Sequence, residues 1–254
     1  MLPVAEAGVS RGLAGGRLSV VVATVLTMTE TRDETTPEPD FLTSTRMFYD
    51  AVAEDYAAQF ARDLADRPLE RAIIQVFAEL VGGEGPVADL GCGPGRTTAR
   101  LASLGLDVFG LDLSESMLAV ARRENPGLRF EQGSMLDLDI PDGTLAGALS
   151  WYSSIHTPVE KLPALFAEFD RVLAPGGHLL VGFQAGDKHR HHDRPWGRPV
   201  SLTFRRRRPE DMVRLLADAG FTLLSQTVRE PQESLEETSP QAFLIARKPA
   251  AVAA

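Results

Sequence analysis

The chain has 254 residues, and its 26 Lys and Arg against 35 Asp and Glu give a formal net charge of −9. This length fits one large α/β domain or two small ones, and the negative charge disfavours binding to nucleic acids or to anionic membranes. A single cysteine, Cys92, excludes an internal disulfide framework and is typical of a reducing compartment. No apolar run approaches the ~18 residues of a membrane span, so we expect a cytoplasmic enzyme or small-molecule-binding protein without membrane contact.

Residues 1–40 differ in composition from the rest of the chain. Residues 18–26 are a short apolar run, whereas residues 29–40 are charged and contain proline, with little apolar surface to bury. We interpret residues 1–40 as a disordered or over-extended N-terminal segment, with Met28 as the candidate true start. A signal peptide and an additional packed strand are the alternatives.

From residue 43, helical and strand patterns alternate along the chain. The expected helices are 43–61, 67–81, 97–104, 114–124, 157–173 and 209–219, and the expected strands are 86–90, 107–112, 128–132, 145–150, 178–184, 221–229 and 242–247. The helix from residue 157 is expected to begin with a capping box made by Thr157 and Glu160.

This alternation predicts a mostly parallel sheet with helices on both faces. The last two strands are joined by a short connection without a helical pattern, so we expect them to pair antiparallel. One domain should therefore occupy residues 41–250, with residues 186–208 as a lid-like polar insertion and residues 251–254 as a tail.

Residues 87–96 (VADLGCGPGR) contain the most informative pattern: a strand enters a loop with glycine at alternate positions, and a helix leaves it. Such glycines let the backbone approach a ligand closely, and the helix start offers free N–H groups. The spacing G-x-G-x-G differs from the dinucleotide fingerprint G-x-G-x-x-G. Asp112 ends the next strand, where a carboxylate suits two ribose hydroxyls. The alternative, a helix cap, is better filled by Ser114.

These segments resemble the class I methyltransferases that use S-adenosylmethionine. The similarity covers about residues 43–248 and rests on VADLGCGPG, on Asp112 in GLDLS followed by Met117, on GSMLDL at 133–138, and on RVLAPGG at 171–177. The resemblance implies a Rossmann-like seven-stranded α/β sheet, mostly parallel with an antiparallel last strand. It also implies S-adenosyl-L-methionine as the cofactor, with S-adenosyl-L-homocysteine as its product.

The resemblance further implies which residues bind the cofactor. The glycine loop, steadied by Asp89, would pack on the methionine part, Asp112 would hold the ribose, and Tyr49 would cover the carboxylate, with a plain core role as the alternative for Tyr49. Where family members often carry an acidic residue against the adenine amino group, this chain has Ser134, a weaker neutral partner, with Asp137 as a substitute. The predicted cofactor-binding residues are Tyr49, Asp89, Gly91, Cys92, Gly93, Gly95, Asp112, Leu113, Met117, Ser134, Met135 and Ser150.

Candidates for the methyl acceptor site follow the expected strands 145–150 and 178–184, because ligands bind beyond the carboxyl ends of such strands. His156 is a candidate neutral base, since an ordinary imidazole has a pKa near ~6.5, and Tyr152 is a candidate for orienting the acceptor or the donor methyl. A structural role for the histidine is the alternative. Further acceptor-binding candidates are Trp151, Gln184, His189, His192 and Trp196.

The insertion carries two further patterns. The three histidines and one aspartate of residues 188–194 match no common zinc spacing, so we expect no metal. The run Arg205–Arg208 is the strongest basic cluster, and nucleic acid, an anionic acceptor group and a solvated turn are all open interpretations.

Together these patterns predict a methyltransferase that acts on an O, N or C atom of a small molecule such as a secondary metabolite. Methylation of RNA or protein is one alternative, and a non-catalytic S-adenosylmethionine-binding regulator is another. The sequence leaves the oligomeric state open.

Overall fold

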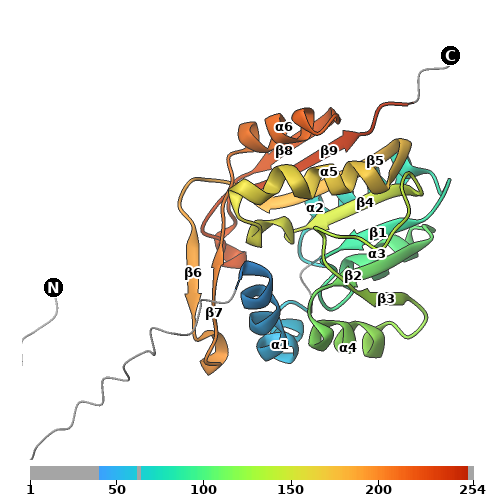
Figure 1. The fold of residues 1–254 in the computed structure, drawn as a ribbon. Helices are drawn as coiled ribbons and strands as arrows, with labels where there is room; N and C mark the ends of the chain where they lie inside the picture. Colours follow the sequence, from blue (N-terminus) through green and yellow to red (C-terminus); the bar gives the residue numbers. More distant parts are fainter. Residues whose placement is uncertain (1–39, 62–63, 251–254) are drawn as a thin grey trace, which may run out of the picture. The chain divides into compact units, whose positions relative to one another are not determined.

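A seven-stranded sheet organises the computed structural model, which describes residues 40–61 and 64–250 (Figure 1). Its strands lie in the order β3-β2-β1-β4-β5-β9-β8. Their bounds are β1 Val87–Leu90, β2 Val108–Asp112, β3 Arg129–Gln132, β4 Leu145–Trp151, β5 Leu173–Gln184, β8 Thr222–Arg229 and β9 Gln241–Arg247. The first five pair in parallel, whereas β9 pairs antiparallel with both β5 and β8. The predicted sheet, including the antiparallel last strand, is confirmed.

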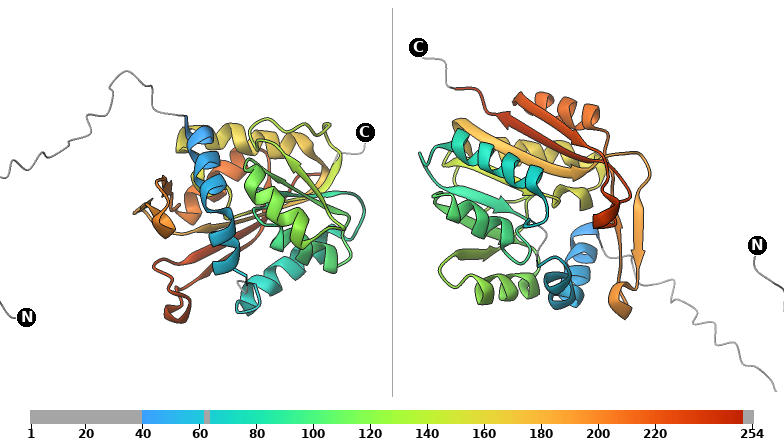
Figure 2. Two further views of the ribbon diagram at one scale, coloured as in Figure 1. Left: turned by 90° about the horizontal axis from the view of Figure 1, so that it is seen from below. Right: turned by 180° about the vertical axis from the view of Figure 1, so that it is seen from behind.

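Helices cover both faces of this sheet, as the two views of Figure 2 show. Their bounds are α1 Phe41–Gln59, α2 Pro68–Val81, α3 Arg96–Ser103, α4 Glu115–Glu124, α5 Leu162–Val172 and α6 Pro209–Asp218. One hydrophobic cluster joins α5 and α6 to the sheet through residues such as Phe166, Phe169 and Met212. A second joins α2 and α3 through Phe77 and Leu101. The sheet is therefore buried between two helical layers, as its apolar strands require.

Local sequence signals account for several element boundaries. Ser114 is the N-cap of α4, where its hydroxyl accepts a hydrogen bond from the Met117 N–H at 3.1 Å. Gly82 ends α2 with φ 66°, a left-handed conformation that favours glycine. The predicted capping box is wrong: α5 begins at Leu162, after a 3-10 turn at Val159–Lys161, and neither start carries a side-chain cap.

The insertion at residues 186–208 contains a two-stranded antiparallel hairpin that the sequence did not predict. Its strands are β6 (Arg190–Asp193) and β7 (Ser201–Phe204), joined through a 3-10 turn at Pro195–Gly197. Leu202 of β7 packs against Phe48 and Val52 of α1, so the hairpin and α1 lie side by side (Figure 1).

The predictions for residues 1–39, for a start at Met28, and for the tail at 251–254 fall outside the described residues. Within the part that the structure describes, no helix combines the length and apolar character needed to cross a bilayer.

Candidate functional site

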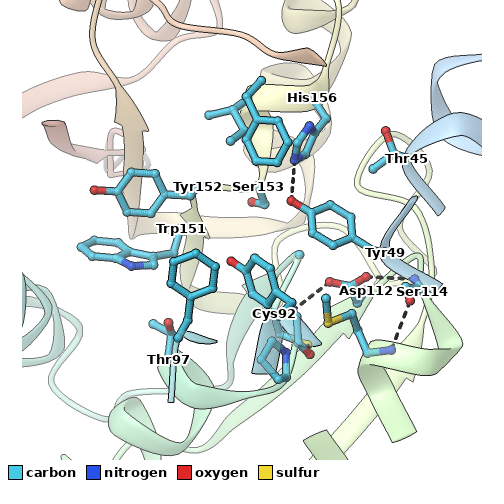
Figure 3. Close-up of a pocket in the computed structure, with 18 of the residues that line it drawn as sticks. Thr45, Tyr49, Cys92, Thr97, Asp112, Ser114, Trp151, Tyr152, Ser153 and His156 are labelled. Carbon is cyan, nitrogen blue, oxygen red and sulfur yellow. Dashed lines mark hydrogen bonds between the residues drawn. The ribbon is translucent and has the colours of Figure 1, made fainter. Parts of the chain in front are cut away.

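A cavity of about 570 Å³ opens where the carboxyl ends of β1, β2 and β4 meet α1 and the hairpin. Figure 3 shows how side chains from these elements point into it. The loop after β1, the end of β2, and the connection between β8 and β9 also contribute to its wall. This volume suits a cofactor or drug-sized ligand.

The glycine loop takes a shape that side chains would prevent. Gly91 has φ 76°, and a Cβ added there would lie 2.3 Å from the Cβ of Ser153. Ser153 itself donates a hydrogen bond to the Leu90 carbonyl at 2.6 Å, so the end of β4 is fastened to the end of β1. Gly93, with φ 52°, has open space beside it. The loop therefore forms one backbone wall of the cavity.

Asp112 fixes this loop from the end of β2. One carboxylate oxygen accepts the Gly93 N–H at 2.8 Å and the other accepts the Ser114 N–H at 2.9 Å. Burial raises the pKa of Asp112, and the two backbone hydrogen bonds oppose that rise. Each carboxylate oxygen has a second lone pair, so Asp112 can still accept hydrogen bonds from a ligand.

Asp89 is a second carboxylate on the same cavity, and it is fully buried. Its Oδ2 accepts a hydrogen bond from the Thr98 hydroxyl at 2.7 Å, but its Oδ1 is buried without a hydrogen-bond partner. Burial raises the pKa of Asp89 to about 7. A buried acceptor without a partner is costly, so the site is suited to a ligand that brings an ammonium group or another donor.

Helix α1 is anchored over this cavity by polar contacts with α4. Asp50 accepts a hydrogen bond from the Ser114 hydroxyl at 2.6 Å, and Glu54 pairs with both terminal nitrogens of Arg123 at 2.6 and 2.9 Å. These contacts hold the face of α1 that carries Tyr49 toward the interior.

Tyr49 and His156 form a hydrogen-bonded pair across the cavity, with Tyr49 Oη 2.8 Å from His156 Nε2 (Figure 3). The rings of Tyr49 and Phe204 pack edge-on against the imidazole. Burial lowers the pKa of His156 to about 3, so the ring is neutral throughout the physiological range. It can accept a hydrogen bond, but it is a much weaker base than an ordinary histidine.

Tyr152 and Trp151 form the cavity wall at the end of β4. Tyr152 has φ 56°, a strained conformation for a non-glycine residue of the kind that often occurs at functional sites. Trp151 stacks on Phe243 of β9 with 5.1 Å between ring centroids. A Cβ on Gly182 would lie 2.9 Å from the indole, so glycine is required beneath it.

Each of the four arginines after the hairpin bonds to another part of the chain. Arg205 donates to the His156 carbonyl at 2.8 Å, and Arg207, which is 8% exposed, donates to the Thr157 carbonyl. Arg206 donates to Thr238 Oγ1 at 2.7 Å, and Arg208 forms an ion pair with an aspartate of the insertion. The solvated-turn interpretation is therefore wrong for Arg205 and Arg207, which hold residues 156 and 157 in place, whereas Arg206 and Arg208 make exposed contacts.

Most of the predicted site residues line the cavity. These are Tyr49, Asp89, Gly91, Cys92, Gly93, Asp112, Leu113, Met117, Met135, Trp151, Tyr152, His156, Gln184, His192 and Trp196. Gly95, Ser134 and Ser150 are not among its lining residues, and Ser150 instead hydrogen-bonds to Ser153. His189 lines a second cavity, of about 430 Å³, beside the arginine run.

The sequence interpretation missed several lining residues, including Arg46, Phe48, Ser153, Arg190 and Phe204. Residues 190 and 192 are two apart on β6, so their side chains lie on the same face of the strand. This spacing is the one sequence signal that could have placed Arg190 beside His192 in the cavity wall. Among the described residues, no group of three His, Cys, Asp or Glu side chains is arranged to hold a metal ion.

Comparisons with known proteins agree with this geometry. Residues 87–177 match the family model of a methyltransferase domain. A trans-aconitate 2-methyltransferase from Rhizobium meliloti is 35% identical over 129 residues, which are 49% of this chain and 48% of that protein. The chain thus spans about half the length of that curated relative.

Solved structures share the fold. The DhpI–SAH complex has a TM-score of 0.65 at 24% identity, covering 84% of this chain and 98% of that one. The [4+2]-cyclase SpnF has a TM-score of 0.58 at 19% identity, covering 81% and 95%. Likeness at this level establishes the architecture, and the activity has to be argued from the site.

Proposed function

We propose that the chain is a class I S-adenosylmethionine-dependent methyltransferase, which transfers a methyl group from S-adenosylmethionine to a small molecule. The observation that carries this proposal is the convergence of the glycine loop, Asp89 and Asp112 on one cavity. We further propose a cytoplasmic enzyme that does not act on nucleic acid.

The residues present fit this cofactor. Asp89 Oδ1, which is buried and lacks a partner, suits the ammonium group of the methionine part. Asp112 suits the ribose hydroxyls, and Met117 and Leu113 supply apolar surface near the end of β2 for the adenine. When bound, S-adenosylmethionine supplies a methyl group on a sulfonium, which reacts without activation by the protein.

The remaining tasks of the chain are alignment of the acceptor and exclusion of water. Tyr49 and His156 offer a phenol and a neutral imidazole to an acceptor. Arg205 donates a hydrogen bond to the backbone carbonyl of His156 and so fixes its position. The hairpin and α1 cover the cavity with Phe48 and Phe204, which exclude water from this part of it.

Methylation of a macromolecule is the less favoured function. The sequence argument for it rested on the run Arg205–Arg208, and three of these side chains bond to groups of the insertion or of the segment 156–157. A basic surface built from this run is therefore not supported.

The direct test is an activity assay with the full chain, S-adenosylmethionine and a library of small acids, phenols and amines. Mass spectrometry should detect S-adenosylhomocysteine in equal amount to a product heavier by one methyl group in place of hydrogen. A protein that binds the cofactor but yields no methylated product with any acceptor would favour the regulator interpretation.

A further inference from the structure

The carboxylates that line the cavity lie on one side of it, together with Arg67, which pairs with Glu237, and Arg96, which donates to the Ala57 carbonyl at 3.2 Å. The carboxylates that line it come from β1, the end of β2 and the connection between β8 and β9, and they are Asp89, Asp112, Glu236 and Glu237. On the opposite side, the first half of α1, the 3-10 turn at Ser154–His156 and the hairpin contribute no lining carboxylate among the described residues. Their ionisable nitrogen-bearing side chains are Arg46, His156, Arg190 and His192. In a chain of net charge −9, this basic side of the cavity is a local exception.

Arg46 and Arg190 are the two permanent charges on the basic side. Among the described residues, neither guanidinium takes part in a hydrogen bond or an ion pair, although Arg46 lies near enough to Asp40 to help lower the pKa of that carboxyl. Neighbouring arginines are already paired: Arg198 binds Asp55 at 2.9 Å, and Arg205 binds the His156 carbonyl. The two guanidiniums are therefore available to a ligand, and a planar guanidinium is suited to binding carboxylate and phosphate groups.

The wall between these arginines and His156 is aromatic. Phe204 lies opposite Arg190 in the hairpin register, and Phe48 and Trp196 also line the cavity. Burial lowers the pKa of His156 to about 3, which suits an acceptor that arrives already ionised better than one whose proton must be removed by a strong base.

We propose that the methyl acceptor is a small organic anion, whose carboxylate or phosphate group binds Arg46 and Arg190 while its apolar body packs against Phe48 and Phe204. This inference rests on the proposed function, and it names the substrate class of the same site.

The test uses matched acceptors that differ in charge. The full chain with S-adenosylmethionine is assayed against aliphatic and aromatic carboxylic acids, their primary amides, and the corresponding phosphate monoesters. Turnover, or binding to the protein loaded with S-adenosylhomocysteine, is expected with an anionic series and not with the amides. The acid and phosphate arms identify which anion is preferred.

The double variant Arg46→Gln, Arg190→Gln should raise KM for the preferred anion about 10- to 100-fold with little change in kcat. A control of equal charge change, Arg129→Gln with Arg214→Gln, alters exposed arginines that do not line the cavity and should leave KM unchanged.

Three results would overturn the inference: amides that react as well as acids, an unchanged KM in the double variant, or a loss of S-adenosylhomocysteine affinity in that variant. The last would place the arginines on the cofactor. Failure of the wild-type chain to bind S-adenosylhomocysteine at all would instead refute the proposed function.

Discussion

Asp89 combines complete burial with an unused acceptor atom. Burial raises its pKa to about 7, and the nearby Asp112 adds to that rise, whereas the hydrogen bond from Thr98 opposes it. A carboxyl group whose pKa is higher in the folded than in the unfolded state destabilises the fold increasingly as pH rises between the two values. Without a ligand, the ionised carboxylate of Asp89 therefore lowers the free energy of unfolding.

The variant Asp89→Asn measures this stability cost. The amide keeps an acceptor for Thr98 and removes the buried charge, so the free energy of unfolding should rise by at most about 4 kcal/mol above pH 7, with the gain disappearing near pH 4. Urea unfolding at pH 4.5 and pH 8 measures it, with the exposed Asp107→Asn as the control. A gain of equal size at both pH values, or a loss at pH 8, would show that the buried charge is not the cause.

Tyr49 was predicted from the family resemblance to cover the cofactor carboxylate, but its hydroxyl lies 2.8 Å from His156 Nε2. From this pairing we propose a role for Tyr49 at the acceptor end of the cavity. Tyr49→Phe should therefore lower turnover about tenfold while leaving S-adenosylhomocysteine affinity within a factor of two. Calorimetry and steady-state kinetics on one preparation separate the two roles. Weakened cofactor affinity with normal kcat would restore the original assignment.

At the scale of elements, a buried ion network joins the start of α2 to the end of β8 and the connection that follows it. Arg229 pairs with Glu70 at 2.6 Å and with Glu237 at 2.7 Å, and Arg67 also pairs with Glu237. The side chains of Glu70, Glu237 and Arg229 are 1%, 7% and 9% exposed. Burial alone would raise the pKa of Glu237, but hydrogen bonds from Arg229, the Gln232 backbone and Arg67 lower it to about 2.

Arg229→Ala should destabilise the protein by about 3–5 kcal/mol, because two buried carboxylates lose their main partner. Arg214→Ala removes an exposed ion pair with Asp211 and should cost at most about 1 kcal/mol. Chemical denaturation of both variants measures the loss in the free energy of unfolding. Equal losses in the two variants would mean that the buried network stabilises the protein no more than an exposed ion pair does.

The hairpin is the element that could not be predicted from the sequence. Its strands have four residues each, and His, Arg and Thr obscure their alternation. They are stabilised by packing of Leu202 against Phe48 and Val52 of α1, which are about 150 residues away from it in the chain. Pairing of this kind depends on tertiary contacts, which local patterns do not carry. The start of α5 was also misplaced: it lies at Leu162, and Arg207 donates to the Thr157 carbonyl at the position where a helix was expected to begin.

At the scale of the molecule, the parallel direction of most strands followed from alternating periodicities, and the antiparallel pairing of the last two followed from one short connection. The proposed cofactor-binding residues could also be predicted from the sequence, because the glycine loop and Asp112 lie within 22 residues of one another and their roles depend on local geometry. The proposed acceptor-binding residues could not all be predicted in this way. Tyr49 and His156 are 107 residues apart, and the free arginines become recognisable only when their neighbours are seen to be paired.

We propose, as the central claim, that the cavity at the carboxyl ends of β1 and β2 binds an adenosyl cofactor through Asp112 and the glycine loop. Calorimetric titration of the full chain with S-adenosylhomocysteine tests it most directly. We expect one site per chain, and a dissociation constant about 10- to 100-fold higher in Asp112→Ala, which loses hydrogen bonds to a charged acceptor. Absence of binding heat and of any thermal stabilisation in folded wild-type protein, or equal affinity in the variant, would contradict the claim.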